Sequence, residues 1–82
     1  MQVTNLVNKL NKMNIQNSIV DLNGYNKEVV FSINNINFSA DFNVNANVIQ
    51  SYSRDICFDN TNQEMQRRFF TSLNSLLKYA NQ

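Results

Sequence analysis

The first dozen residues carry apolar side chains at the spacing of an α-helix. Val3, Leu6 and Leu10 recur at helical intervals, while Asn8 and Lys12 fall on the opposite side. Apolar positions with a period near 3.6 residues form one stripe along a helix. The pattern therefore predicts an amphipathic helix at this end of the chain.

Two stretches rich in β-branched residues follow, and each ends at a turn signal. Residues 15–23 end at Asn23-Gly24, and residues 27–33 end at Asn34-Asn35. β-Branched residues favour strands. Asn-Gly is a strong signal for a tight hairpin because its residues tolerate positive φ, and an Asn-Asn pair tolerates the same conformation. We therefore expect two strands of an antiparallel meander, with Gly24 at positive φ in a type I′ turn.

Residues 36–48 alternate between apolar and polar side chains without a break. The apolar set is Ile36, Phe38, Ala40, Phe42, Val44, Ala46 and Val48. The polar set is Asn37, Ser39, Asp41, Asn43, Asn45 and Asn47. This period of two predicts a strand with one buried face. Because strands usually run for about 5–6 residues, we expect a bend or a turn within residues 43–47.

Residues 48–58 are predicted as a further strand that carries Tyr52, Ile56 and Phe58. A short helix that starts near Asn47 is the alternative for the same residues. The local pattern leaves both open.

The last twenty residues return to helical spacing. Thr61 and Glu64 have the spacing of a capping box, in which each side chain bonds a free amide at the start of a helix. The expected buried stripe is Met65, Phe69, Leu73, Leu76, Leu77 and Ala80, with Phe70 at its margin. We therefore predict one C-terminal helix that starts near Thr61.

These elements predict an α+β fold in a single domain, residues 1–82. One face of the antiparallel sheet is apolar, so an N-terminal and a C-terminal helix are expected to pack on that face. The result is a two-layer sandwich with a sheet of three to four strands, whose other face meets water.

Composition removes most catalytic and metal chemistry. The chain has no His, one Cys and one Gly, whereas histidine bases, zinc clusters and glycine-rich phosphate loops need those residues. Asp55 and Asp59 flank Cys57 and would disfavour its thiolate. We therefore expect no enzymatic activity, no cofactor and no metal.

The same composition bears on the compartment. Cys57 has no partner for an intramolecular disulfide, which favours a reducing cytoplasm. The apolar runs are far shorter than the ~20 residues that span a bilayer, and no basic segment followed by an apolar stretch stands at the N-terminus. We therefore expect a cytoplasmic protein with no membrane association.

Amide side chains dominate the predicted surface. The sequence holds 17 Asn against 13 charged residues and has a net charge of +1. Amides and hydroxyls both donate and accept hydrogen bonds, and they lose water more easily than charges do. We therefore expect a protein-binding surface. Its candidate residues are Asn37, Ser39, Asp41, Asn43, Asn45 and Asn47 on the sheet, and Arg67 and Asn74 on the outward side of the last helix. The plainer alternative is that the sheet residues are the solvated half of an ordinary strand.

Arginines provide a second hypothesis. Arg54, Arg67 and Arg68 could hold phosphate, with Tyr52 nearby to stack on a base. Binders of single strands combine a basic groove with several exposed aromatic rings. Most aromatic rings of this chain are needed in the core, so nucleic acid is not expected as the main ligand.

In size and order of elements the chain resembles the small phage-encoded anti-CRISPR proteins with an α-β-β-β-α core. The resemblance covers residues 3 to about 43: the helix TNLVNKLNKM, a strand, and EVVFSINNINFSA as two strands joined by an Asn-Asn turn. It implies a phage or mobile-element protein that binds a CRISPR effector in the cytoplasm of a bacterial host. Acidic inhibitors of this shape mimic DNA, whereas six acids against seven bases here favour occlusion of a protein surface or a blocked conformational change.

The sequence thus predicts a non-enzymatic inhibitor that binds a protein of a bacterial defence system, in particular a CRISPR effector complex. A small nucleic-acid-binding or regulatory protein is the first alternative. A phage structural or assembly subunit is the second, since no proline or run of lysines protects the sheet edges from pairing. Both a monomer and a homodimer are compatible with the sequence.

Overall fold

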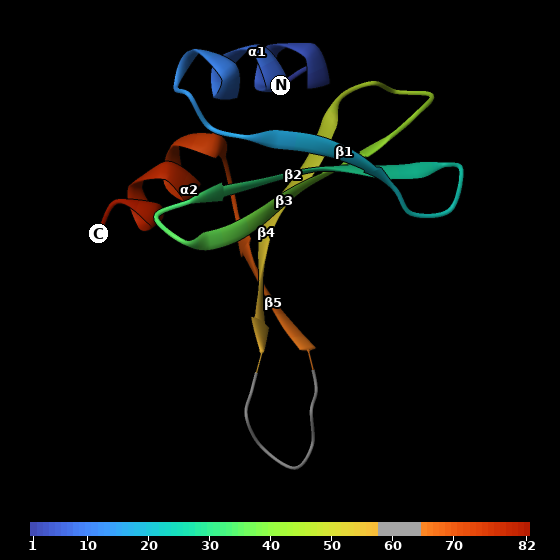
Figure 1. The fold of residues 1–82 in the computed structure, drawn as a ribbon. Coiled ribbons are helices and arrows are strands. Elements are labelled where there is room, and N and C mark those ends of the chain that lie inside the picture. Colours follow the sequence, from blue (N-terminus) through green and yellow to red (C-terminus); the bar gives the residue numbers. More distant parts are fainter. Residues whose placement is uncertain (58–64) are drawn as a thin grey trace.

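The computed structural model, which describes residues 1–57 and 65–82, consists of an antiparallel sheet with a helix near each end of the chain (Figure 1). The described residues form two helices and five strands. In chain order these are α1 (Val3–Lys12), β1 (Asn17–Asp21), β2 (Asn26–Ile33), β3 (Ile36–Asn43), β4 (Ile49–Cys57), β5 (Met65–Phe70) and α2 (Leu73–Ala80). The predicted α+β class is confirmed.

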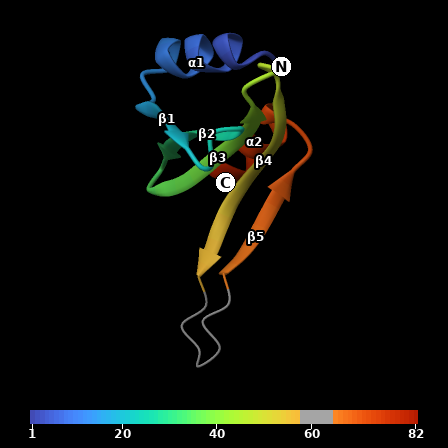
Figure 2. The same cartoon turned by 90° about the vertical axis from the view of Figure 1, so that its right-hand side faces the viewer.

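The sheet is a meander with the order β1-β2-β3-β4-β5. Every neighbouring pair is antiparallel. The prediction of three to four strands was therefore wrong by at least one strand. Between the two predictions for residues 48–58, the strand is confirmed, while Phe58 lies outside the described residues. β4 and β5 extend together away from the helices (Figures 1 and 2).

Asparagine shapes the tight turns, as the sequence predicted. Asn34 and Asn35 have φ values of 51° and 66° and join the paired residues Ile33 and Ile36, which is a two-residue hairpin. Positive φ at both central positions is the mark of a type I′ turn. The predicted turn within residues 43–47 also forms, with β3 ending at Asn43.

The first hairpin differs in detail from the prediction. Gly24 has the expected positive φ of 86°, but Asn23 is not at positive φ, so the type I′ turn does not form there. β1 ends at Asp21 and β2 starts at Asn26, which leaves a longer loop. The Asn23 side chain closes this loop by accepting the backbone N–H of Asn26 at 2.9 Å.

The predicted C-terminal helix starting near Thr61 was wrong for residues 65–70. Residues 65–70 form β5, and α2 begins only at Leu73. The observed capping box lies at Ser72 and Ser75, where the Ser75 backbone N–H donates to Ser72 Oγ at 3.2 Å. The predicted box of Thr61 and Glu64 falls outside the described residues.

The free edge of β4 explains this correction. β5 pairs with β4 from Cys57 opposite Met65 to Tyr52 opposite Phe70, so its ladder satisfies the backbone groups of that edge. Phe70 then packs toward the core, whereas Phe69 is 63% exposed. A helix would have placed these two residues the other way round.

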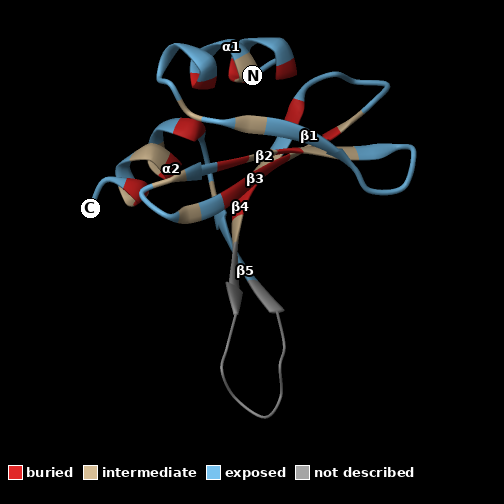
Figure 3. Cartoon of the chain, viewed as in Figure 1, coloured by how far each residue is buried: buried red, intermediate tan, exposed pale blue. Residues whose placement is uncertain are grey.

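One core unites both helices with one side of the sheet (Figure 3). Leu6 and Leu10 of α1 and Leu76 of α2 are fully buried in it. The strands contribute alternate residues, among them Val29, Phe31, Phe38, Ala40 and Phe42. The apolar half of the alternation in residues 36–42 is thus confirmed, whereas Val44 and Val48 lie in or beside the turn and are exposed.

Candidate functional site

The side of the sheet opposite the core carries the polar half of the alternation, and no described helix contributes to it. We call this side the open face. It includes Ser18 and Val20 of β1, Glu28, Val30 and Ser32 of β2, Asn37, Ser39 and Asp41 of β3, Ser51 and Ser53 of β4, and Arg67 and Phe69 of β5. Directly opposed residues of an antiparallel pair project to the same side, so the register itself assigns these side chains to one surface.

A straight row of side chains crosses the open face. The register pairs Ser18 with Val30, Val30 with Ser39, Ser39 with Ser53, and Ser53 with Phe69. The row therefore links all five described strands. Its centre is polar yet buried: Ser39 and Ser53 are 8% and 1% exposed, and their hydroxyls lie 3.2 Å apart in a hydrogen bond. Its end at Phe69 is an exposed aromatic ring.

An ion pair crosses β4 on the same face. Arg67 Nη1 of β5 lies 3.6 Å from Asp41 Oδ2 of β3, with side chains that are 40% and 27% exposed. Because β4 lies between these strands, the pair passes over the strand that carries the buried Ser53. A partly exposed pair of this kind adds at most about 1 kcal/mol of stability. Glu28 is the register partner of Asp41, so two carboxylates and one guanidinium meet here.

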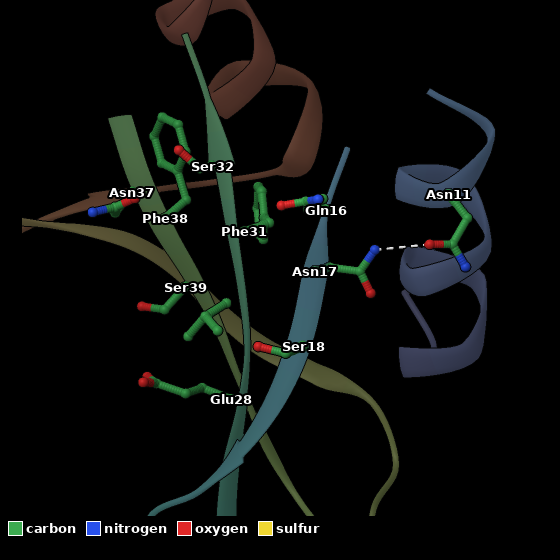
Figure 4. Close-up of a pocket in the computed structure, with 11 residues that line it drawn as sticks. Asn11, Gln16, Asn17, Ser18, Glu28, Phe31, Ser32, Asn37, Phe38 and Ser39 are labelled. Atoms are coloured by element: carbon green, nitrogen blue, oxygen red, sulfur yellow. Dashed lines mark hydrogen bonds between the residues drawn. The ribbon is translucent and has the colours of Figure 1, made fainter. Parts of the chain in front are cut away.

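A hollow beside β1, β2 and β3 takes side chains from both sides of the sheet. It has a volume of about 840 Å³. Serine hydroxyls, amides and the Glu28 carboxylate line it together with the apolar side chains of Val30, Phe31 and Phe38. Figure 4 shows the side chains of Asn37, Ser39 and Glu28 pointing to the same side of the strands. A hydrogen bond of 2.8 Å from Asn17 to Asn11 ties the start of β1 to α1 beside it.

The structure brings four of the predicted binding residues together and separates the others. Asn37, Ser39, Asp41 and Arg67 share the open face, although Arg67 lies on a strand rather than on the predicted helix. The remaining four predicted residues are Asn43, Asn45, Asn47 and Asn74. Three of these four do not lie on the strands of this face, and Asn43 lies at its margin.

Their local roles explain this separation. Asn43 ends β3 and accepts the Asn45 backbone N–H at 2.9 Å, so its side chain shapes the turn. Asn47 has a φ of 54°, and its backbone carbonyl accepts the Val3 N–H at 3.2 Å. Asn74 is exposed on α2. The prediction that Asn45 and Asn47 extend the polar sheet face was therefore wrong. Asn43 still pairs with Asn26 in the sheet, and Asn74 lies on the C-terminal helix, as predicted.

Several residues of the open face escaped the sequence analysis, among them Glu28, Ser53 and Phe69. The alternation within residues 27–33 carries the signal for Glu28. Val29 and Phe31 are core residues, so Glu28 and Val30 project to the opposite side of the strand. Ser53 was not predicted because the sequence pattern left both a strand and a helix open for residues 48–58. Phe69 was assigned to a buried helical stripe, and only the strand places it outside.

The arginines of the nucleic-acid hypothesis do not form one patch. Arg67 lies on the open face, paired with Asp41. Arg54 and Arg68 oppose each other on β4 and β5 and project to the other side of the sheet, where both lie over the ring of Tyr79. Tyr52 is buried in the core, and this burial raises the pKa of its phenol above the ordinary 10.0. It offers no ring for base stacking.

The described part of the chain shows neither a cluster of metal ligands nor a membrane-spanning helix. No group of three or more metal-ligating side chains occurs among residues 1–57 and 65–82. Within the same ranges, neither helix is both long and apolar enough to cross a membrane.

Comparisons with known proteins add no assignment. No protein-family model matches the sequence, and no curated protein and no solved structure matches the chain.

The buried serine pair yields a prediction for the stability of the open face. Ser39→Ala is expected to lower the free energy of unfolding by about 1–3 kcal/mol because it leaves the buried Ser53 hydroxyl without its partner. The double variant Ser39→Ala with Ser53→Ala is expected to lose less than the sum of the single variants. Urea unfolding followed by circular dichroism measures all three. Strict additivity would contradict a bond between the two hydroxyls.

Proposed function

We propose that this chain is a non-enzymatic protein-binding domain that docks on its partner through the open face. The observation that carries the proposal is the exposed Phe69 ring at one end of the row that crosses the open face, with the partly polar hollow at β1, β2 and β3 towards the other end. Protein interfaces combine aromatic anchors with a polar surround in this way.

The charges of the open face favour a protein partner over nucleic acid. Asp41 lies in an ion pair with Arg67, and its register partner is Glu28, so this surface has no excess of positive charge among its described residues. Phosphates need clustered basic side chains. Hydroxyls and amides, in contrast, form hydrogen bonds to protein backbone and side chains at a low desolvation cost.

A CRISPR effector complex is the narrower target of the proposal. It is supported by the resemblance of size and element order to anti-CRISPR proteins and by a near-neutral net charge, which fits surface occlusion better than DNA mimicry. Inhibition then follows from binding alone, because an occluded surface of an effector cannot meet its own substrate or a moving domain.

The test compares two doubly substituted variants with the same change of charge. Asn37→Arg with Phe69→Lys alters the open face, and Asn5→Arg with Tyr25→Lys alters exposed positions on α1 and on the β1–β2 loop. Each variant is used to capture partners from nuclease-treated lysate of CRISPR-bearing bacteria. Each is also expressed in cells whose CRISPR system targets a plasmid, and plasmid survival is counted.

We expect wild type and the Asn5/Tyr25 variant to retain the same partner and to raise plasmid survival equally. The Asn37/Phe69 variant is expected to lose at least about tenfold in partner affinity. Equal capture by all three proteins would contradict the role of the open face. A partner that disappears after nuclease treatment would favour the nucleic-acid alternative, and capture without an effect on plasmid survival would restrict the proposal to binding of another protein.

A further inference from the structure

Two arginines share one tyrosine ring on the core side of the sheet. Arg54 of β4 and Arg68 of β5 are direct register partners. Their guanidinium carbons lie 5.7 Å and 4.6 Å from the centre of the Tyr79 ring in α2. Arg54 Nη1 also donates a hydrogen bond of 2.6 Å to the Tyr79 hydroxyl. We call these three residues the Arg54–Tyr79–Arg68 cluster.

The ring at the centre of this cluster is held firmly by the core. Tyr79 packs against Phe70 at a centroid distance of 5.1 Å and meets Phe38 edge-on at 6.4 Å. A fixed ring under two guanidinium groups orients both of them through cation–π attraction. The cluster is therefore built before any ligand arrives, which lowers the entropy cost of binding.

The positive charges of the cluster lack a counter-charge in the described part of the chain. The ion pair found there belongs to Arg67 and Asp41, on the other side of the sheet. Arg54 Nε is buried and has no acceptor among the described residues. Like charges directly opposite each other on neighbouring strands are destabilising, and an unpaired buried donor adds a further cost. An anion bound beside the two guanidinium groups would offset the repulsion between them.

We propose that the Arg54–Tyr79–Arg68 cluster is a binding site for a carboxylate that an acidic segment of a protein partner provides. A guanidinium presents parallel N–H groups that match the two oxygens of a carboxylate. Arg68 is exposed and is able to meet the ligand first. Arg54 is partly buried beside Arg68. Its charge adds to the attraction for the carboxylate, and this attraction is stronger in a less polar surrounding.

The geometry favours a carboxylate over nucleic acid for two reasons. The Tyr79 ring is covered by guanidinium groups and by phenylalanine contacts, so it is not free to stack on a base. Arg67 projects to the other side of the sheet, so two arginines, and not three, face a ligand here. A polyanion needs a longer basic track.

The choice of a protein ligand rests on the proposed function, but the site itself is separate from the open face. A substitution that abolishes binding at the open face would leave this cluster intact. A substitution in the cluster would likewise leave the open face intact. Variants at Asn37 and Phe69 therefore test the proposed function, whereas variants at Arg68 test this inference.

The experiment is a titration followed by nuclear magnetic resonance of the arginine side-chain N–H groups in the full chain. The probe is a capped oligoglutamate peptide at constant ionic strength, with capped oligoglutamine as its uncharged match. Oligothymidylate is titrated in parallel. We expect oligoglutamate to shift the Nε–H resonances of Arg54 and Arg68 in a saturable way, with no such shift from oligoglutamine.

Arginine variants test which side chains contact the oligoglutamate peptide. Arg68→Gln is expected to weaken oligoglutamate binding at least about tenfold, whereas Arg67→Gln on the open face changes it by less than about twofold. Arg68→Lys keeps the charge but loses the planar fork, so it is also expected to weaken binding. Absent shifts, full affinity in Arg68→Lys, or tighter binding of oligothymidylate at the same resonances would each overturn the inference.

Discussion

Phe38→Ala is expected to lower the free energy of unfolding by about 3–5 kcal/mol. Phe38 lies on the central strand β3 and is 2% exposed. Its ring stacks on Phe31 at 5.7 Å and meets Phe70 and Tyr79 edge-on at 5.8 Å and 6.4 Å. Removing it leaves a cavity where β2, β5 and α2 join, and small domains have little stability to spare.

Urea unfolding of Phe38→Ala, followed by far-ultraviolet circular dichroism, measures this effect. Asn37→Ala is the matched control because it changes the neighbouring residue on the exposed side of the same strand, and it is expected to cost less than about 0.5 kcal/mol. A loss of stability below about 1 kcal/mol for Phe38→Ala would show that this ring does not hold the core together.

The second large effect distinguishes the observed strand from the helix that the sequence predicted. Phe70 packs into the core against Phe38 and Tyr79, whereas Phe69 is 63% exposed. Phe70→Thr is therefore expected to lower the free energy of unfolding by about 2–3 kcal/mol. Phe69→Thr is expected to change it by about 0.5 kcal/mol or less. Threonine retains a high β-propensity at both sites, so the comparison isolates burial.

The same unfolding experiment measures both variants side by side. A single helix from residue 61 to residue 80 would bury Phe69 and leave Phe70 at the margin, so it would reverse the order of the two effects. Phe69→Thr also separates stability from binding: it is expected to leave the fold intact while weakening the partner contact at the open face.

Local patterns in the sequence were sufficient for the first half of the chain. The stripe of Leu6 and Leu10 predicted α1, and the alternation from Ile36 to Phe42 predicted which side of β3 is buried. The pair Asn34-Asn35 predicted the hairpin between β2 and β3, because asparagine tolerates the positive φ that this turn requires. Each of these signals depends on residues that are neighbours in the sequence.

The candidate site was predictable only in part. Alternation assigned Asn37, Ser39 and Asp41 to the polar side of a strand, and the structure confirms this placement. The same alternation continued through Asn45 and was wrong there, because a turn of the chain has the same polar composition as the exposed half of a strand. Composition does not distinguish the two.

Local patterns were enough to predict the fold class, the first helix, the meander with its Asn-Asn hairpin and the polar character of one sheet face. The conformation of residues 65–70 and the side of the sheet on which each arginine lies depend on tertiary contacts. Met65, Phe69 and Leu73 fit a helical stripe, but the unpaired edge of β4 offers these residues a ladder of backbone hydrogen bonds that a local pattern does not contain. Because of that pairing, Phe69 is exposed and Arg67 forms an ion pair with Asp41. Arg68 lies beside Arg54 on the other side of the sheet, and both contact the ring of Tyr79. Both candidate binding surfaces therefore depend on a strand register, which is set by contacts between residues distant in the sequence.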